Sequence, residues 1–439
     1  MKTPWPLFLA LAIATSLAPH SRAQDLETYE LPPINYSHAT PQDAITRLQA
    51  RLNSRALNLA GTDREVVQTL LRELHIPPAS QLLVFSKTSF QKDRISPHHP
   101  RALYYTDNCY VGWVPGGLVE IAAIDAQLGP VFYSFDPQAL SEKNRPNFSR
   151  ENDCLRCHGG NFVPGIPAVF ARSVYADQEG EPLYRQGTKV VDYRTPFAER
   201  WGGWYVTGTH GSTLHRGNVL ASEKNGQLVF NPARGANVTN LSPFFAPGDY
   251  LTNSSDLVSL LVFEHQTAMQ NALTSAGLNC RHMLDYQKRL QAALHEPDTG
   301  NELRYDSVRS VFDHAAEAVV DTLLFKDEAA LPETITGFAA FQKAFTADAP
   351  QAKDGSSLKE LLLAEQLFKN RCSYLIYSDS FLALPQPLKR RIYARLAKAL
   401  ELEQPDPRYI YIHRSERQRI AIILRETHSE FRNYLSEDK

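Results

Sequence analysis

The sequence predicts an α+β protein, because strand patterns and helix patterns occupy different parts of the chain. Residues 81–250 contain short runs rich in Val, Tyr, Phe and Trp, interrupted at short intervals by Gly, Pro, Asn and Asp. From residue 256 onward, apolar residues recur at helical spacing instead. We therefore expect short N-terminal helices, a strand-rich central region and a mostly helical C-terminal part.

The first 23 residues have the pattern of a secretory signal peptide. Lys2 supplies a positive charge, residues 5–18 form an apolar run, and the small-residue site at 21–23 indicates cleavage before Gln24. The run is shorter than the roughly 20 apolar residues that cross a bilayer, and no later stretch supplies them. We expect an exported chain that does not span the membrane.

Two helices are predicted next, at residues 41–56 and 63–75, where apolar residues follow helical spacing. Thr40 and Thr62 are the expected N-caps, and Pro41 suits a first turn. The strands that follow are expected at residues 82–85, 102–106, 118–124, 131–135, 168–175 and 228–230.

The C-terminal part is divided into helices by the same spacing rule. They are expected at residues 257–276, 308–325, 358–368, 387–402 and 416–427. Ser255 and Ser415 are the expected caps of the first and the last. The change of pattern near residue 250 separates a region of residues 24–250 from a region of residues 251–439.

Composition excludes several classes of protein. The chain has 439 residues, a net charge of −2 and 21% charged residues, which gives no indication of a nucleic-acid partner. Five cysteines are too few for a disulfide scaffold. In an oxidising compartment two of Cys109, Cys280 and Cys372 could pair, and the sequence does not decide between them.

One motif carries chemistry: Cys154 and Cys157 are followed directly by His158. This Cys-x-x-Cys-His spacing is the attachment pattern of a c-type haem. Two thiols can reach the two vinyl groups of one porphyrin, while the imidazole reaches the iron from the same side. Gly159 and Gly160 lack a Cβ, which would let the chain pass close to the ring.

Two other interpretations compete with haem attachment, namely a disulfide or redox pair and half of a zinc site. A zinc site needs further ligands at a regular spacing, and the sequence has no second Cys-x-x-Cys and no His-x-x-x-His. Export also favours haem, because c-type haem is attached outside the cytoplasm.

The pentapeptide at 154–158 resembles that of the cytochrome c superfamily. The resemblance implies one covalent haem c with His158 as an axial iron ligand, in a bacterial protein that is periplasmic or secreted. Residues 94–97, 110–113, 201–205 and 373–378 are similar to segments of uncharacterised secreted bacterial proteins with one haem motif. Small carrier cytochromes are compact helical domains with the motif near their start, so we expect a different fold here.

The sixth iron ligand is open to several interpretations. His265 and Met269 lie four residues apart in the first C-terminal helix, so both face the same side. His210 or His215 are alternatives, as is an open or water-filled position. Each residue also has an ordinary core role: a hydrogen-bonded histidine, or a methionine that fills space.

The segment 193–218, which includes Arg200, is rich in Arg, Trp, Tyr, His and Gly. It can wrap a haem edge, or it can be a glycine-rich hairpin that packs on a sheet.

The sequence is compatible with three functions. The first is single-electron transfer with a periplasmic redox partner. The alternative is a haem-dependent oxidoreductase of peroxidase-like type, with an open iron face and His210, Arg200 or His265 assisting. A haem-based sensor is the third.

Overall fold

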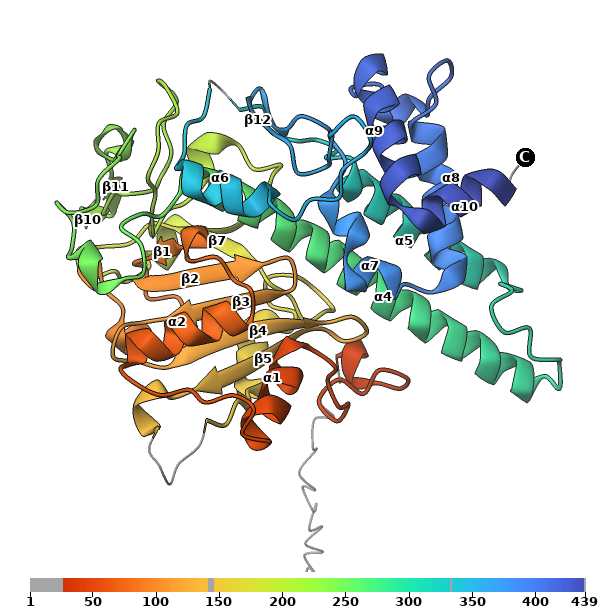
Figure 1. The fold of residues 1–439 in the computed structure, drawn as a ribbon, viewed down its shortest axis with the longest axis horizontal. Helices are drawn as coiled ribbons and strands as arrows, with labels where there is room; N and C mark the ends of the chain where they lie inside the picture. The colour runs from red at the N-terminus through yellow and green to blue at the C-terminus, as the bar shows by residue number, and fades with distance from the viewer. Residues whose placement is uncertain (1–26, 141–145, 332–333, 438–439) are drawn as a thin grey trace, which may run out of the picture.

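The computed structural model describes residues 27–140, 146–331 and 334–437, so the expected signal peptide lies outside the described residues. The α+β prediction is confirmed (Figure 1): a seven-stranded antiparallel sheet precedes a mostly helical C-terminal part. The strand order is β6-β5-β4-β3-β2-β1-β9. The strands are β1 (Leu82–Val84), β2 (Arg101–Thr106), β3 (Cys109–Trp113), β4 (Val119–Asp125), β5 (Gly129–Phe135), β6 (Ser149–Arg150) and β9 (Trp204–Tyr205).

Strands β2 to β5 form a meander of hairpins, and each pairs with the next along the chain. The predicted strands at 82–85, 102–106, 118–124 and 131–135 are confirmed, while β3 was not among the predicted runs. Three small hairpins lie outside the sheet: β7 (Ala171–Val174) with β8 (Thr188–Val191), β10 (Ser222–Lys224) with β11 (Gln227–Val229), and β12 (Leu361–Ala364) with β13 (Gln366–Phe368).

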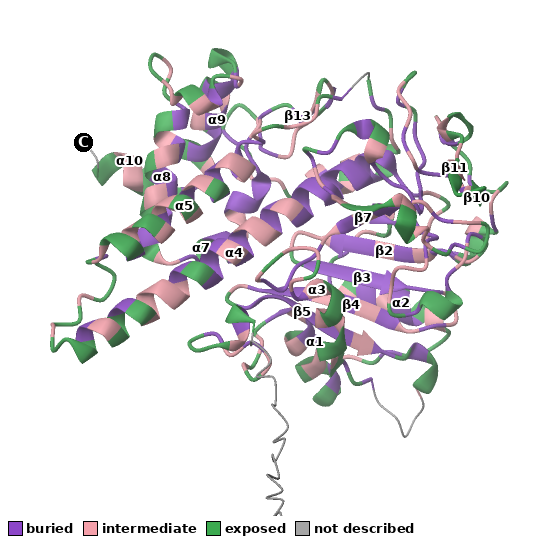
Figure 2. Cartoon of the chain, turned by 180° about the vertical axis from the view of Figure 1, so that it is seen from behind, coloured by how far each residue is buried: buried purple, intermediate pink, exposed green. Residues whose placement is uncertain are grey.

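The ten helices of the described residues are α1 (Ala44–Asn53), α2 (Asp63–Glu73), α3 (Leu155–His158), α4 (Leu257–Ala293), α5 (Asp306–Leu323), α6 (Ala339–Thr346), α7 (Asp379–Leu382), α8 (Gln386–Ala399), α9 (Arg414–Thr427) and α10 (Ser429–Glu437). Helix α4 is longer than expected, and its first half is buried while its second half extends beyond the sheet (Figure 2). None of these helices is long and apolar enough to cross a membrane.

Side-chain alternation gives the sheet two buried faces. On β2, Ala102 and Tyr104 point into a core cluster that includes residues of α1 and α2. Leu103 and Tyr105 point the other way, into a cluster that includes the first half of α4. Helices α1 and α2 therefore cover one face of the sheet and α4 crosses the other.

The helix starts differ from the prediction at several points. Thr62 caps α2 as expected, and Glu65 completes a capping box. Helix α1 is instead capped by Asp43, whose carboxylate accepts hydrogen bonds from the backbone of Ile45 and Thr46, so Thr40 and Pro41 precede the helix. A carboxylate three residues further along is an equally good cap.

The prediction that Ser255 and Ser415 cap helices α4 and α9 is also wrong. Asp256 caps α4 through the Ser259 backbone, 2.9 Å away. The Ser255 hydroxyl instead donates to the Tyr205 carbonyl on the edge strand, at 2.6 Å. Helix α9 begins at Arg414 after His413, and Ser415 lies inside it.

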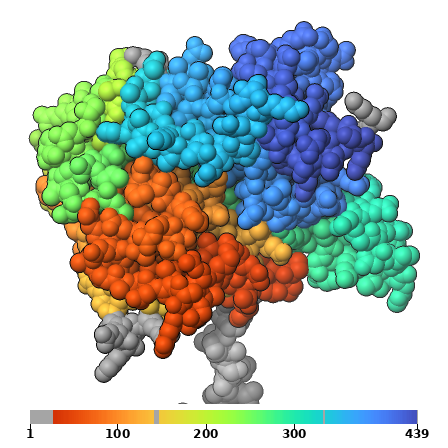
Figure 3. All heavy atoms as spheres, viewed as in Figure 1, coloured from red at the N-terminus to blue at the C-terminus, as the bar shows by residue number. Residues whose placement is uncertain are grey.

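The helix predicted at 358–368 is wrong, because these residues form the β12–β13 hairpin. Leu363 and Glu365 have φ values of +60° and +67°, which no α-helix accommodates. Short runs of leucine fit a strand and a buried helix equally well. Residues 334–370 contribute to the surface between the strand-rich region and the C-terminal helices (Figure 3).

Candidate haem-attachment site

The three motif residues lie on a short turn of helix that follows the edge strand β6. Cys154 ends a 3-10 turn at Asn152–Cys154, and α3 then carries Cys157 and His158. Gly159 ends the helix, and a Cβ there would overlap the Tyr29 hydroxyl, which donates to the Gly159 carbonyl at 3.0 Å. This glycine is therefore required by packing against the N-terminal segment, a reason that the sequence did not indicate.

His158 is held in the state that binds metals. Its Nδ1 lies 2.8 Å from the carbonyl oxygen of Ala168, and its ring packs between Phe132 and Phe170, with ring centroids 4.9 and 4.8 Å away. Burial lowers the pKa of His158 to about 4. The neutral ring thus donates its Nδ1 hydrogen to the carbonyl and keeps the Nε2 lone pair, as metal-ligating histidines do.

A cavity of about 320 Å³ lies beside the motif and is lined by all three motif residues. We call it the motif cavity. Its volume is at the lower end of the range for ligand sites, roughly 300–1,000 Å³. Its apolar wall comes from the sheet, the β6–β7 connection, the loop after β1 and α4: Phe90, Leu103, Gly112, Ala122, Phe132, Val169, Phe170 and Phe263.

The two thiols lie at different depths. Cys154 is half-buried and Cys157 is exposed. Burial raises the pKa of the Cys154 thiol to about 12. Cys154 is therefore a neutral thiol at neutral pH.

The positively charged side chain of Arg101 also lines the motif cavity. Arg101 lies over the backbone of Gly112, where any Cβ would overlap the guanidinium, and its Nη2 is 2.8 Å from Glu120. Its buried Nε has no hydrogen-bond partner among the described residues. A buried donor without a partner suits a carboxylate.

These features fit a haem. A porphyrin has two apolar faces and two carboxylates, and the wall offers apolar surface, one free imidazole nitrogen and one unsatisfied guanidinium nitrogen. No group of three or more His, Cys, Asp or Glu side chains in the described ranges is placed to hold a bare metal ion.

The residues predicted as sixth ligands lie elsewhere. His265 is fully buried, its Nε2 is 2.8 Å from the Ser373 hydroxyl, and its ring stacks on Phe325 at 3.9 Å. Met269 is fully buried in the core cluster on the same side of the sheet. Neither lines the motif cavity, which α4 reaches through Phe263.

His210 and His215 pack against each other, with ring centroids 4.7 Å apart, and against Phe197. They do not line the motif cavity either. Arg200 is 2% exposed and its Nη1 lies 2.8 Å from Glu264, while its Nε donates to the Thr195 carbonyl at 2.7 Å. The 193–218 segment is thus attached to α4 by a buried ion pair, which favours its packing role.

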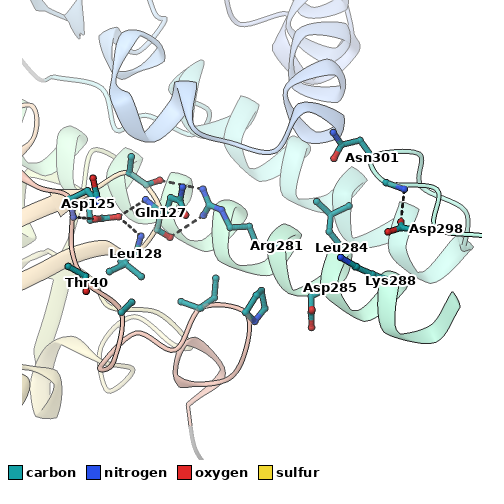
Figure 4. A pocket seen from close by; sticks show the side chains of 16 residues that line it. Thr40, Asp125, Gln127, Leu128, Arg281, Leu284, Asp285, Lys288, Asp298 and Asn301 are labelled. Atoms are coloured by element: carbon teal, nitrogen blue, oxygen red, sulfur yellow. Dashed lines mark hydrogen bonds between the residues drawn. The ribbon is translucent and has the colours of Figure 1, made fainter. Parts of the chain in front are cut away.

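Two further features of the described chain lie outside the motif. Cys109, Cys280 and Cys372 are buried free thiols. A second cavity of about 840 Å³ lies between the N-terminal segment, the β4–β5 turn and the projecting half of α4 (Figure 4). It shares no lining residue with the motif cavity.

The site therefore places two thiols and a neutral imidazole beside one cavity. Comparison with known proteins found no matching family model, no matching curated protein and no matching solved structure.

Proposed function

We propose that the chain binds one haem c covalently through Cys154 and Cys157, with His158 as an axial iron ligand, and that it transfers single electrons. One observation carries the proposal. His158 is neutral, its Nδ1 is hydrogen-bonded to the Ala168 carbonyl, which leaves Nε2 available to a metal, and the residue lines the motif cavity together with both cysteines. When bound, the haem supplies one-electron redox chemistry.

The chain's own residues would position and protect the group. Ala168 would set the tautomer and angle of His158, and Phe132 and Phe170 pack against that ring. Arg101 is placed to pair with a propionate. Low polarity near the iron and a hydrogen bond on the axial histidine are two of the features that tune a haem potential.

Electron transfer needs a cofactor edge that a partner can approach. The rim of the motif cavity supports this, since Cys157 is exposed and the Asp153 and Arg156 side chains are 62% and 81% exposed. The partner that we propose is a redox protein of the periplasm, the compartment to which the expected signal peptide would direct the chain.

A second function, a haem-dependent oxidoreductase with an open iron face, is favoured by one observation. His265 and Met269 are buried in the core away from the motif cavity, whereas Tyr110 is among the residues that line it. A sixth position left to a small ligand would suit such an enzyme.

Covalent attachment tests the proposal directly. The chain, expressed with its signal peptide in a bacterium that matures c-type haem, should keep its haem through denaturing electrophoresis and acid–acetone extraction. C154A/C157A should lose this haem, because no thioether can form. C280A, which removes a buried thiol outside the motif, should keep it.

Redox titration of the wild type should then give one reversible one-electron transition. A wild-type chain that carries no covalent haem would refute the proposal.

A further inference from the structure

Gln266 of α4 fixes the direction in which the Tyr110 hydroxyl donates. The Gln266 side-chain nitrogen lies 2.7 Å from the carbonyl oxygen of Thr106 and 2.8 Å from the Tyr110 hydroxyl. The Gln266 side-chain oxygen accepts from the Tyr374 hydroxyl at 2.8 Å. A carbonyl only accepts, so the amide nitrogen must face Thr106, and this sets the orientation of the whole amide.

The consequence falls on Tyr110. Both amide hydrogens of Gln266 are used, one by Thr106 and one by Tyr110, so the Tyr110 oxygen is an acceptor in this network. Its own hydrogen must point elsewhere, and no group within the described part of the chain accepts it. Tyr110 is one of the residues that line the motif cavity.

Burial keeps Tyr110 in the form that donates. It is 6% exposed, and burial raises the pKa of its phenol far above the ordinary value. A phenolate, which could ligate iron directly, is therefore disfavoured. Tyr110 is therefore a neutral phenol among the residues that line the motif cavity.

We propose that Tyr110 donates a hydrogen bond to a small anion that binds in the motif cavity, of the class that azide and cyanide represent. This inference rests on the proposed function, because a haem would provide the binding position for the anion. It adds a recognition element that the motif alone does not contain.

Azide affinity, measured by optical titration of the oxidised protein, tests the inference. Y110F removes one oxygen and leaves the Gln266 nitrogen bonded to Thr106, so the network keeps its other contacts. Hydrogen bonds to charged groups are strong enough that azide should bind Y110F roughly 10- to 100-fold more weakly. Carbon monoxide is neutral and a weak acceptor, and its binding to the reduced protein should change little.

Y105F is the matched control. Tyr105 stacks on Tyr110 with ring centroids 6.3 Å apart and is also buried. Its hydroxyl donates to the Ser259 carbonyl, and it does not line the motif cavity. Its azide affinity should equal that of the wild type.

Equal azide affinity in Y110F and wild type would overturn the inference. Covalent haem that binds no azide would also overturn the inference, because the iron would then have no position open to the anion, and the proposed function would stand. Loss of covalent haem in the wild type would refute both.

Discussion

The Nδ1 atom of His158 is hydrogen-bonded to the Ala168 carbonyl, and its Nε2 atom remains available to bind a metal. Because burial lowers the pKa of His158 to about 4, protons compete for its Nε2 mainly below about pH 5. Ligation by His158 should therefore hold throughout the neutral range without a nearby carboxylate. The Ala168 carbonyl makes the imidazole only modestly more basic than a free one, since it carries no full charge.

His265 gives a prediction of pH-dependent stability. Burial lowers the pKa of His265 from 6.5 to about 3, so the folded chain holds it neutral where the unfolded chain protonates it. Its contribution to stability is complete above pH 6.5 and is lost as the pH falls towards 3. H265Q keeps a side-chain amide that can reach Ser373 and removes the titration.

The free energy of unfolding of H265Q should thus fall less steeply than that of the wild type from pH 6.5 downward. Urea titrations at a series of pH values measure both slopes. Parallel curves would mean that His265 is not held neutral by the fold.

At the residue scale, sequence reasoning reached the motif and no further. Cys154, Cys157 and His158 are adjacent in sequence, so their spacing alone indicates their chemistry. Arg101 and Tyr110 give no such signal, because an isolated arginine or tyrosine in a strand is usually structural. Their place in the wall of the motif cavity depends on which strands pair.

At the element scale, the register of the meander assembles that wall. Leu103 on β2 pairs with Gly112 on β3, and Gly112 pairs with Glu120 on β4. Arg101, two residues before Leu103, shares its face and can reach Glu120 across the glycine. The strands β2 and β4 were predictable from composition, but their pairing was not, since neither turn signals nor alternation fixed the register.

The length of α4 was also underestimated, because apolar spacing weakens after Ala276. Arg281 explains part of what holds the second half in place. It donates to the carbonyls of Gln127 and Ala126 in the β4–β5 turn, at 3.1 and 3.4 Å (Figure 4). It also donates to the carbonyl of Ala383 after α7, at 3.0 Å. One side chain of α4 thereby links the sheet to the C-terminal helices.

R281M should lower the free energy of unfolding by about 1–3 kcal/mol, because three carbonyls lose a charged donor while the apolar stem is retained. K288M is the control. Lys288 lies two turns after Arg281 on α4, and both residues line the cavity of about 840 Å³ shown in Figure 4. Removal of the Lys288 ammonium group should change the free energy of unfolding by less than about 0.5 kcal/mol. Denaturant titrations compare the two variants. Equal stabilities would show that Arg281 does not couple these elements.

At the scale of the whole molecule, the boundary near residue 250 marks a change of secondary structure and not a gap in the core. One core cluster contains Leu82 and Tyr105 from the sheet together with Leu260 of α4 and Phe312 of α5. The ion pair between Arg200 and Glu264 also crosses the boundary and is almost fully buried. Breaking a buried pair of this kind costs several kcal/mol, so neither region should be stable without the other.

Two optical probes can follow the two regions separately. Trp113, Trp201 and Trp204 are buried in the strand-rich region, whereas most of the helical residues lie after residue 256. Tryptophan fluorescence therefore reports on the first region and far-ultraviolet circular dichroism mainly on the second. Because one core joins them, both signals should change at the same urea concentration in the protein without haem, as in a single cooperative transition. A dichroism transition that is separate from the fluorescence transition would mean that the helices unfold as an independent domain, in spite of the shared core.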